Sequence, residues 1–289
     1  MTDNSGLTQY IYYFLSTLVG TCVPIFFFTS GYLLLNKDVH LNKIWGKMIK
    51  IIILILFWRM ITFPILHLFT GTPFDFKSII IDTFSFHSGY TNHLWYLAAL
   101  LFLYSVLPII KFLFDENIKL LLFLLLTIST FVFGSKLLSQ TFNIADILIT
   151  TNNLQVIPFN NFISDFNFYS SSRGFGIVYF MIGGLIYRYP KVVKKTTPLN
   201  YFGLIILFIF LQFTYNVMYS LNFNTLYDPV WWTYDNIFTI PLVVTLYLFI
   251  DNFVVSNQIF RKIISLVGSN SLGIYLVHNI VIQLTSKYK

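Results

Sequence analysis

The chain has 289 residues, of which 56% are hydrophobic, 20% aromatic and only 10% charged, and its formal net charge is +7. Soluble domains carry about 25% charged residues, and disordered chains are polar and poor in aromatic residues, so the composition excludes both classes. The net charge is positive, but the sequence shows no basic patch with side chains suited to recognise nucleic-acid bases. We therefore expect no nucleic-acid partner.

Eight apolar segments approach the length of about 20 residues that a membrane-spanning helix requires. The fifth, seventh and eighth are short and are expected to extend into their polar flanks. The sequence predicts an all-α fold, a polytopic bundle of about eight transmembrane helices that forms one membrane-embedded domain over residues 1–289 in a cell membrane. In chain order the segments are Tyr10–Leu35, Ile51–Phe69, Leu94–Leu113, Leu120–Leu138, Gly174–Tyr187, Tyr201–Tyr219, Ile237–Ile250 and Leu272–Leu284.

The positions of lysine and arginine predict the orientation of these segments. Most of the 18 basic residues fall in the first, third, fifth and seventh loops, which are therefore expected to be cytoplasmic. Trp231 and Trp232 then lie at the outer interface, where aromatic belts occur. Both chain ends also come out on the outer side, although neither has a charge pattern that favours it. We expect the chain to be truncated at both ends, unless one weak span is wrong.

Three stretches are more specific than hydropathy, and a fourth is weaker. The three are Val23–Leu34, His93–Leu97 with the following Tyr104 and Leu107–Ile109, and Ser271–His278, and the weaker one is Met181–Arg188. In their order and separation they resemble acyltransferase family 3, and the resemblance covers essentially the whole chain. The members of that family are polytopic membrane proteins that acylate, most often acetylate, surface and secreted glycans.

The resemblance implies an O-acyltransferase that moves an acyl group, most often acetyl, from cytoplasmic acyl-CoA to a hydroxyl of an extracytoplasmic or lipid-linked glycan. It also implies about ten helices, with both ends cytoplasmic and a catalytic histidine on the first helix. That histidine maps onto no residue here, and the final family helix is missing as well. Acetyl-CoA is thus the expected donor, and a glycan and the lipid bilayer are the expected partners.

Ser271, Tyr275 and His278 are spaced i, i+4 and i+7, so they share one face of a helix. His278 is expected about 10 Å from the cytoplasmic end of that helix, at 1.5 Å per residue. A polar stripe inside a membrane usually faces the bundle interior or a water-filled cavity. We interpret His278 as catalytic, in a proton relay, and Ser271 and Tyr275 as contacts to the acyl thioester. A hydrogen-bonded stripe that joins helices is the alternative.

His93 lies at the predicted outer mouth of the third span, beside Trp95 and Tyr96. A histidine in this place can act as a catalytic base on a sugar hydroxyl, and the two aromatic rings can stack on the sugar. The alternative is an interfacial histidine within an aromatic belt.

The remaining candidate binding residues are lysine and arginine side chains. Arg59 interrupts an apolar run, and it is interpreted as binding an anionic group of a substrate, pairing with Asp251 or reaching an interface. Lys43, Lys47 and Arg188 are candidates for the phosphates of coenzyme A. Orientation in the membrane and attraction to anionic lipid are the alternative reasons for these three cations.

Two further expectations concern metal and the rival function. The lone cysteine, Cys22, provides no Cys/His zinc site, so we expect no metal. The asparagine-rich and aromatic segment Ser139–Ser172 suits either a glycan surface or a lid over the bundle. A transporter or exporter of a polysaccharide or its precursor is the alternative function, because polar residues and prolines within spans also suit a translocation path.

Overall fold

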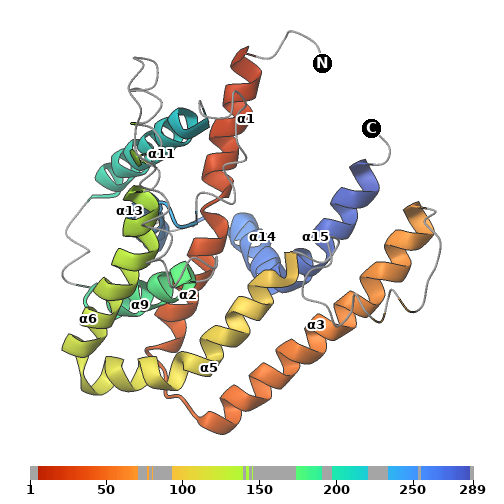
Figure 1. The fold of residues 1–289 in the computed structure, drawn as a ribbon, viewed down its shortest axis with the longest axis horizontal. Coiled ribbons are helices and arrows are strands. Elements are labelled where there is room, and N and C mark those ends of the chain that lie inside the picture. Colours follow the sequence, from red (N-terminus) through yellow and green to blue (C-terminus); the bar gives the residue numbers. More distant parts are fainter. Residues whose placement is uncertain are drawn as a thin grey trace. The chain divides into compact units, whose positions relative to one another are not determined.

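The structure is a computed structural model, and it describes residues 6–70, 77, 80, 93–138, 141–142, 145, 174–190, 197–220, 234–252 and 255–286. Every element named over these residues is a helix, which confirms the predicted all-α fold (Figure 1). Each of the eight predicted apolar segments coincides with one helix or with two consecutive ones. Trp231, Trp232 and nearly all of the 139–172 segment lie outside the described residues.

Several described helices are long and apolar enough to cross a membrane. Four segments qualify alone, and a fifth qualifies if Gln258–Ser269 and Ser271–Thr285, which meet at a bend of 72°, form one broken span. Helix α6 (Ile118–Ser129) turns Phe123 and Leu126 outward, with 65% and 68% of these residues exposed, and lipid is the solvent that such an apolar surface needs. The four segments are Thr8–Leu34, Trp95–Glu116, Ile118–Leu138 and Pro198–Met218.

The helices belong to two compact units, and α5 runs through both of them, passing from the second to the first after Pro108. The first unit comprises residues 1–38 and 109–253, and the second comprises residues 39–108 and 254–289. The first holds α1 (Gly6–Val19), α2 (Cys22–Leu34), the end of α5 (Trp95–Glu116), α6 (Ile118–Ser129), the π-helix η2 (Thr130–Gly134), α9 (Gly174–Arg188), α11 (Pro198–Ser220) and α13 (Thr239–Asp251). The second holds α3 (Leu41–Thr70), the start of α5, α14 (Gln258–Ser269) and α15 (Ser271–Ser286).

Within the first unit, α2 and α9 lie side by side with their backbones almost touching (Figure 1). A Cβ atom on Gly31 would collide with the carbonyl of Phe180, and one on Gly183 would collide with the carbonyl of Phe28. Small residues allow this approach in a membrane, where dispersion contacts between helices replace the hydrophobic effect. The Val23–Leu34 and Met181–Arg188 stretches thus pack against each other.

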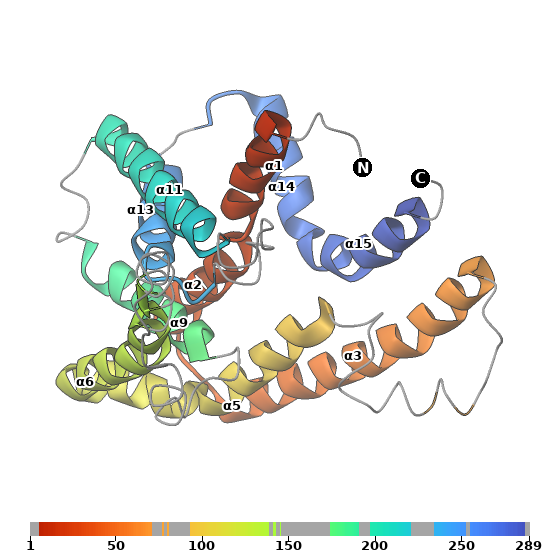
Figure 2. The ribbon, with the colours of Figure 1, turned by 45° about the horizontal axis from the view of Figure 1, so that its top comes forward.

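A second helix pair completes the core of the first unit. Helices α11 and α13 lie beside each other (Figure 2), joined by a cluster of Ile205, Ile209 and Leu242. Leu242 is fully buried, and the other two side chains are nearly so. This pair also carries buried polar side chains, among them Gln212 on α11 and Thr239 on α13.

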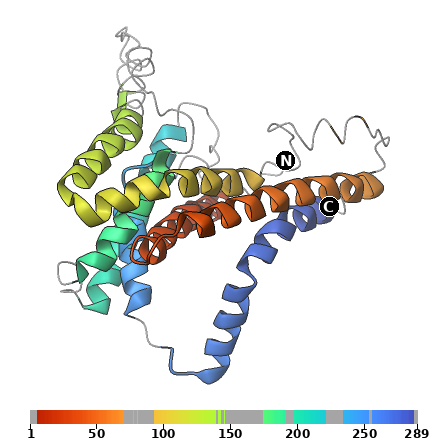
Figure 3. The same ribbon diagram turned by 90° about the horizontal axis from the view of Figure 1, so that it is seen from below.

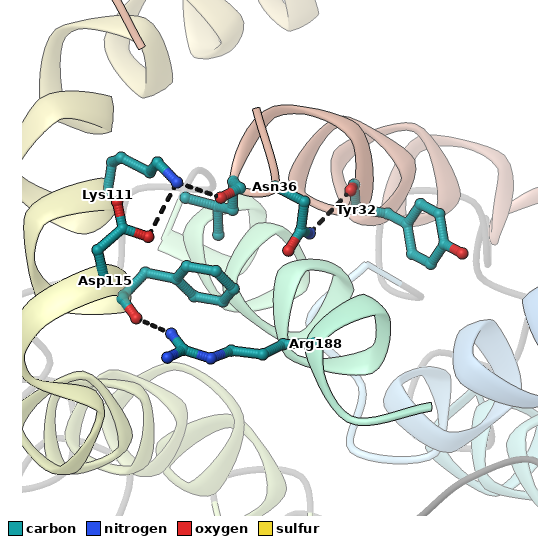
Figure 4. Close-up of polar contacts among 7 residues, drawn as sticks. Tyr32, Asn36, Lys111, Asp115 and Arg188 are labelled. Atoms are coloured by element: carbon teal, nitrogen blue, oxygen red, sulfur yellow. Dashed lines mark hydrogen bonds and ion pairs between the residues drawn. The ribbon is translucent and has the colours of Figure 1, made fainter. Parts of the chain in front are cut away.

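Two cations hold helix ends together at one end of the first unit (Figure 4). Lys111 Nζ donates to the carbonyl of Leu35, 2.8 Å away, and pairs with Asp115 at 2.9 Å. Arg188 donates to the carbonyl of Phe114 and lies 4.9 Å from the centroid of the Phe114 ring. The last carbonyls of a helix lack partners within the helix and carry partial negative charge, so these cations stabilise the ends of α2 and α5.

The second unit has a smaller apolar core, formed by Leu94, Leu97 and Leu276. Ile55 and Trp58 of α3 pack against it. The His93–Leu97 and Ser271–His278 stretches therefore meet in this unit. Figure 3 shows the bend between α14 and α15, where a new helix begins directly after Asn270.

Candidate active site

The second unit brings two histidines together. His93 lies two residues before the start of α5, and His278 lies midway along α15. Their ring centroids are 5.3 Å apart, and the ring planes are nearly perpendicular at 84°. The sequence predicted the two histidines separately, and their proximity is a finding of the structure. Leu276 packs against Leu94 and Leu97, and this contact brings the middle of α15 to the start of α5.

Tyr275 connects the two histidines. Its hydroxyl donates to the carbonyl of His93, and its own carbonyl accepts from Nδ1 of His278. The Tyr275 ring lies 5.8 Å from the His93 ring and 5.6 Å from the Tyr96 ring, and Trp95 contacts Tyr96 at 6.5 Å between centroids. Four of the predicted site residues thus form one aromatic cluster with His278.

The imidazole of His93 is poised as a proton acceptor. Burial, helped by the nearby His278, lowers the pKa of His93 to about 4, while a hydrogen bond with the backbone of Leu276 opposes the shift. The ring is therefore neutral at pH 7. Because the Leu276 bond raises the pKa, the ring donates in it, and a neutral imidazole then keeps one lone pair. Nδ1 is buried and has no hydrogen-bond partner among the described residues, so that lone pair is available for chemistry.

A family model described as an acyltransferase domain matches residues 2–289, nearly the whole chain. The chain belongs to the acyltransferase 3 family. It is therefore a membrane acyltransferase, and the resemblance drawn from the four stretches is confirmed. No curated protein and no solved structure matches the chain at a significant level.

Arg59 of this acyltransferase is deeply buried in the second unit. Only 6% of the residue is exposed, and no other charged side chain in the described part of the chain is as fully buried. It shares a face of α3 with Ile55, which packs on the Leu94 core, and with the buried Thr62. A charge inside a membrane protein is costly, so a buried arginine is a functional candidate.

The other predicted residues are dispersed. Ser271 opens α15 one turn before Tyr275, and within the described residues its side chain makes no hydrogen bond to the cluster. The predicted coenzyme A cations are divided between the units. Lys43 and Lys47 are exposed on α3, with Lys47 5.6 Å from the centroid of the Tyr104 ring, whereas Arg188 is engaged at the end of α5.

The sequence reasoning missed two residues that extend the polar face of α15. Asn279 and Gln283 are both half-buried, and both interact with neighbours. The signal was present, because they continue the four-residue spacing that runs from Ser271 to Tyr275. The polar stripe therefore covers three turns of the helix beyond Ser271.

Proposed function

We propose that the protein transfers an acetyl group from acetyl-CoA to a hydroxyl of an extracytoplasmic or lipid-linked glycan. The observation that carries the proposal is the His93–His278 pair, with ring centroids 5.3 Å apart in an apolar and aromatic setting. Acyl transfer between oxygen and sulfur needs a base for the acceptor hydroxyl, and a buried neutral imidazole is such a base.

The reaction assigns roles to four members of the cluster. Nδ1 of His93 takes the proton of the acceptor hydroxyl while the hydroxyl oxygen attacks the carbonyl carbon of the thioester. The new carbon–oxygen bond forms, the carbon–sulfur bond breaks, and the proton passes to the departing sulfur of coenzyme A. Tyr275 holds His93 through its backbone carbonyl. Tyr96 and Trp95 offer aromatic faces on which the carbon–hydrogen face of a sugar can stack.

The donor is expected to use the cations of the second unit. Lys43 and Lys47 are exposed one turn apart on α3, a spacing that suits the phosphates of coenzyme A. Arg59, buried further along the same helix, is the cation that we expect to stabilise the oxyanion that develops on the thioester carbonyl.

The test uses acetyl-CoA labelled in the acetyl group. Membranes from cells that lack the protein hold the unacetylated acceptor, whatever its identity, and are mixed with membranes that contain the full protein. We expect the label to appear in the glycan fraction and to be released by mild alkali, as oxygen esters are. Glycan that crosses the bilayer without gaining label would instead support the exporter.

A further inference from the structure

Helix α14 (Gln258–Ser269) is exposed along its whole length, although half of it is apolar. All 12 of its residues are exposed. Six of them are large apolar residues, each between 51% and 69% exposed. They are Ile259, Phe260, Ile263, Ile264, Leu266 and Val267. An exposed apolar surface of this kind marks a contact with a partner or with lipid.

The apolar and polar side chains of α14 occupy separate faces of the helix. At about 100° per residue, the six apolar side chains fall within an arc of about 160°, and every polar side chain falls within the remaining arc. The polar face holds Gln258, Arg261, Lys262, Ser265 and Ser269. A wide apolar face opposite a cationic face is the pattern of a helix that lies in the surface of a membrane.

The bend after Asn270 turns α14 away from the direction of α15. The two helices meet at 72° (Figure 3). A helix of 12 residues is about 18 Å long, and at this angle it extends only about 6 Å along the axis of α15. Helix α15 exposes Ile274, Val277 and Val281 along one face, as the lipid-facing side of a span does. When α15 crosses the membrane, α14 therefore lies close to the plane of the membrane surface.

Arg261 and Lys262 indicate which lipid α14 meets. Both are exposed, and no aspartate or glutamate follows Asp251 in the sequence, so neither α14 nor α15 carries a carboxylate that could pair with them. Nη2 of Arg261 donates to the carbonyl of Val255 at 3.0 Å, and the guanidinium has further N–H donors for a phosphate. The distribution of basic residues predicts that this loop is cytoplasmic, on the side where the leaflet carries anionic lipid.

We propose that α14 lies in the plane of the cytoplasmic leaflet, with its apolar face among the acyl chains and with Arg261 and Lys262 bound to the phosphate groups of anionic lipids. Because α15 begins directly after Asn270, the depth of α14 fixes the depth of α15, which carries Tyr275 and His278. The inference goes beyond the transfer reaction and does not depend on the acceptor.

The first measurement identifies what covers each face of α14. Ile263→Cys on the apolar face and Ser265→Cys on the polar face each carry a nitroxide, in the full protein on a Cys22→Ala background. The vesicles contain phosphatidylcholine with about 30% phosphatidylglycerol. Oxygen concentrates among the acyl chains and a neutral nickel complex stays in water, so collisions with each reagent report the surroundings of the label. We expect the oxygen-to-nickel ratio to be at least fivefold higher at Ile263→Cys than at Ser265→Cys.

The two positions are only about 3 Å apart along the helix axis, so a membrane-spanning α14 would place both labels at nearly the same depth. Similar ratios at Ile263→Cys and Ser265→Cys would therefore mean that α14 is part of a span. Shelter of the Ile263→Cys label from both reagents would mean that protein covers the apolar face. Either result would overturn the proposal. Both positions are exposed, so neither substitution removes a packed side chain.

The second measurement tests the headgroup. A fluorophore on Ser265→Cys is quenched by lipids that carry a nitroxide on the same acyl carbon but have either a phosphatidylglycerol or a phosphatidylcholine headgroup. We expect the phosphatidylglycerol probe to quench at least threefold more strongly, and we expect this excess to disappear when Arg261→Gln and Lys262→Gln are combined. The matched control combines Arg261→Lys with Lys262→Arg, which keeps both charges and should keep the excess.

Equal quenching by the two probes in the parent, or an excess that survives the loss of both charges, would show that these cations do not bind anionic lipid, and the proposal would be wrong. Neither measurement involves acetyl transfer. Failure of the proposed function would therefore leave both readouts intact, and failure of this inference would leave the transfer assay unaffected.

Discussion

Both units bring together stretches that lie far apart in the chain, but they do so in opposite ways. In the first unit, α2 and α9 meet through glycines whose missing side chains let the backbones touch. In the second unit, α5 and α15 meet through side chains, with Tyr275 donating to His93 across 182 residues. The first pairing depends on the absence of side chains, and the second depends on contacts that side chains make.

The contrast shows that a residue in the family stretches can serve either the assembly of the helices or the chemistry. Gly31 and Gly183 determine whether the helices can assemble, and they offer no chemical group. The apolar core of the second unit is formed by Leu94, Leu97 and Leu276. His93 and His278 are not part of it, and their rings can transfer protons. Substitutions in the first pairing should therefore lower stability, and those in the second should lower activity in a folded protein.

The largest effect is expected for Gly183→Ala. The added methyl group would collide with the backbone carbonyl of Phe28, which cannot turn away as a side chain can, so we expect a loss of about 3 kcal/mol in the free energy of unfolding. The yield of monodisperse protein and its thermal unfolding in detergent measure this loss. Gly203→Ala on α11 is the control, because nothing lies within 4 Å of the new atom. Equal behaviour of the two variants would contradict the glycine crossing.

Removal of either histidine comes next. We expect His93→Ala and His278→Ala each to reduce acetyl transfer more than tenfold, within the range of acid–base and positioning roles, with protein levels in the membrane near normal. His40→Ala, an exposed histidine of the same unit, is the matched control and should transfer at the parental rate. Parental rates in both cluster variants would show that the rings only join the helices.

Acid should weaken the second unit through His93. Its pKa is about 4 in the folded protein and lies near 6.5 in the unfolded chain, so the unfolded state binds more protons between these values. The stability associated with the neutral ring is therefore present above about pH 6.5 and is lost as the pH falls toward 4. We expect the melting temperature to fall more between pH 7.5 and pH 5 in the parent than in His93→Gln. The same fall in both proteins would exclude His93 as the titrating group.

The smallest effect is expected for Tyr275→Phe. The change keeps the ring contacts with His93 and Tyr96 but removes the hydroxyl that donates to the His93 carbonyl. One hydrogen bond of this kind contributes about 0.5–1.5 kcal/mol, so transfer should drop less than tenfold and stability only slightly. A loss as large as that of His278→Ala would mean that the hydroxyl itself takes part in the chemistry.

The helical nature of the chain could be predicted because apolar runs and the sparse charges determine it locally. The pairing of helices could not, since periodicity assigns residues to a face of one helix without naming the helix opposite. His278 could therefore be assigned to the same stripe as Tyr275, but its contact with His93 could not be predicted. The predicted start at Leu272 agrees with the observed start of α15 at Ser271, but no local pattern indicated that the middle of this helix would contact the start of α5.

The buried polar side chains of α11 and α13 show a different limit to prediction from the sequence. Gln212 and Asn216 lie four residues apart inside the apolar run Tyr201–Tyr219, which is a visible signal of one polar face. The hydrogen bond from Gln212 to Thr239 depends on the packing of α11 against α13, which only the structure reveals. Amides within a predicted span therefore indicate a polar face, but not the helix that this face contacts.

The glycine crossing of α2 and α9 can form only after both helices have been synthesised. About 150 residues separate its two halves, and a ribosome adds roughly 5–20 residues per second, so α2 leaves the ribosome on the order of 10 s before α9. During this interval the bare backbone around Gly31 faces lipid or the insertion machinery. The tightest contact of the first unit is thus made late, and a chain arrested before α9 emerges cannot close it.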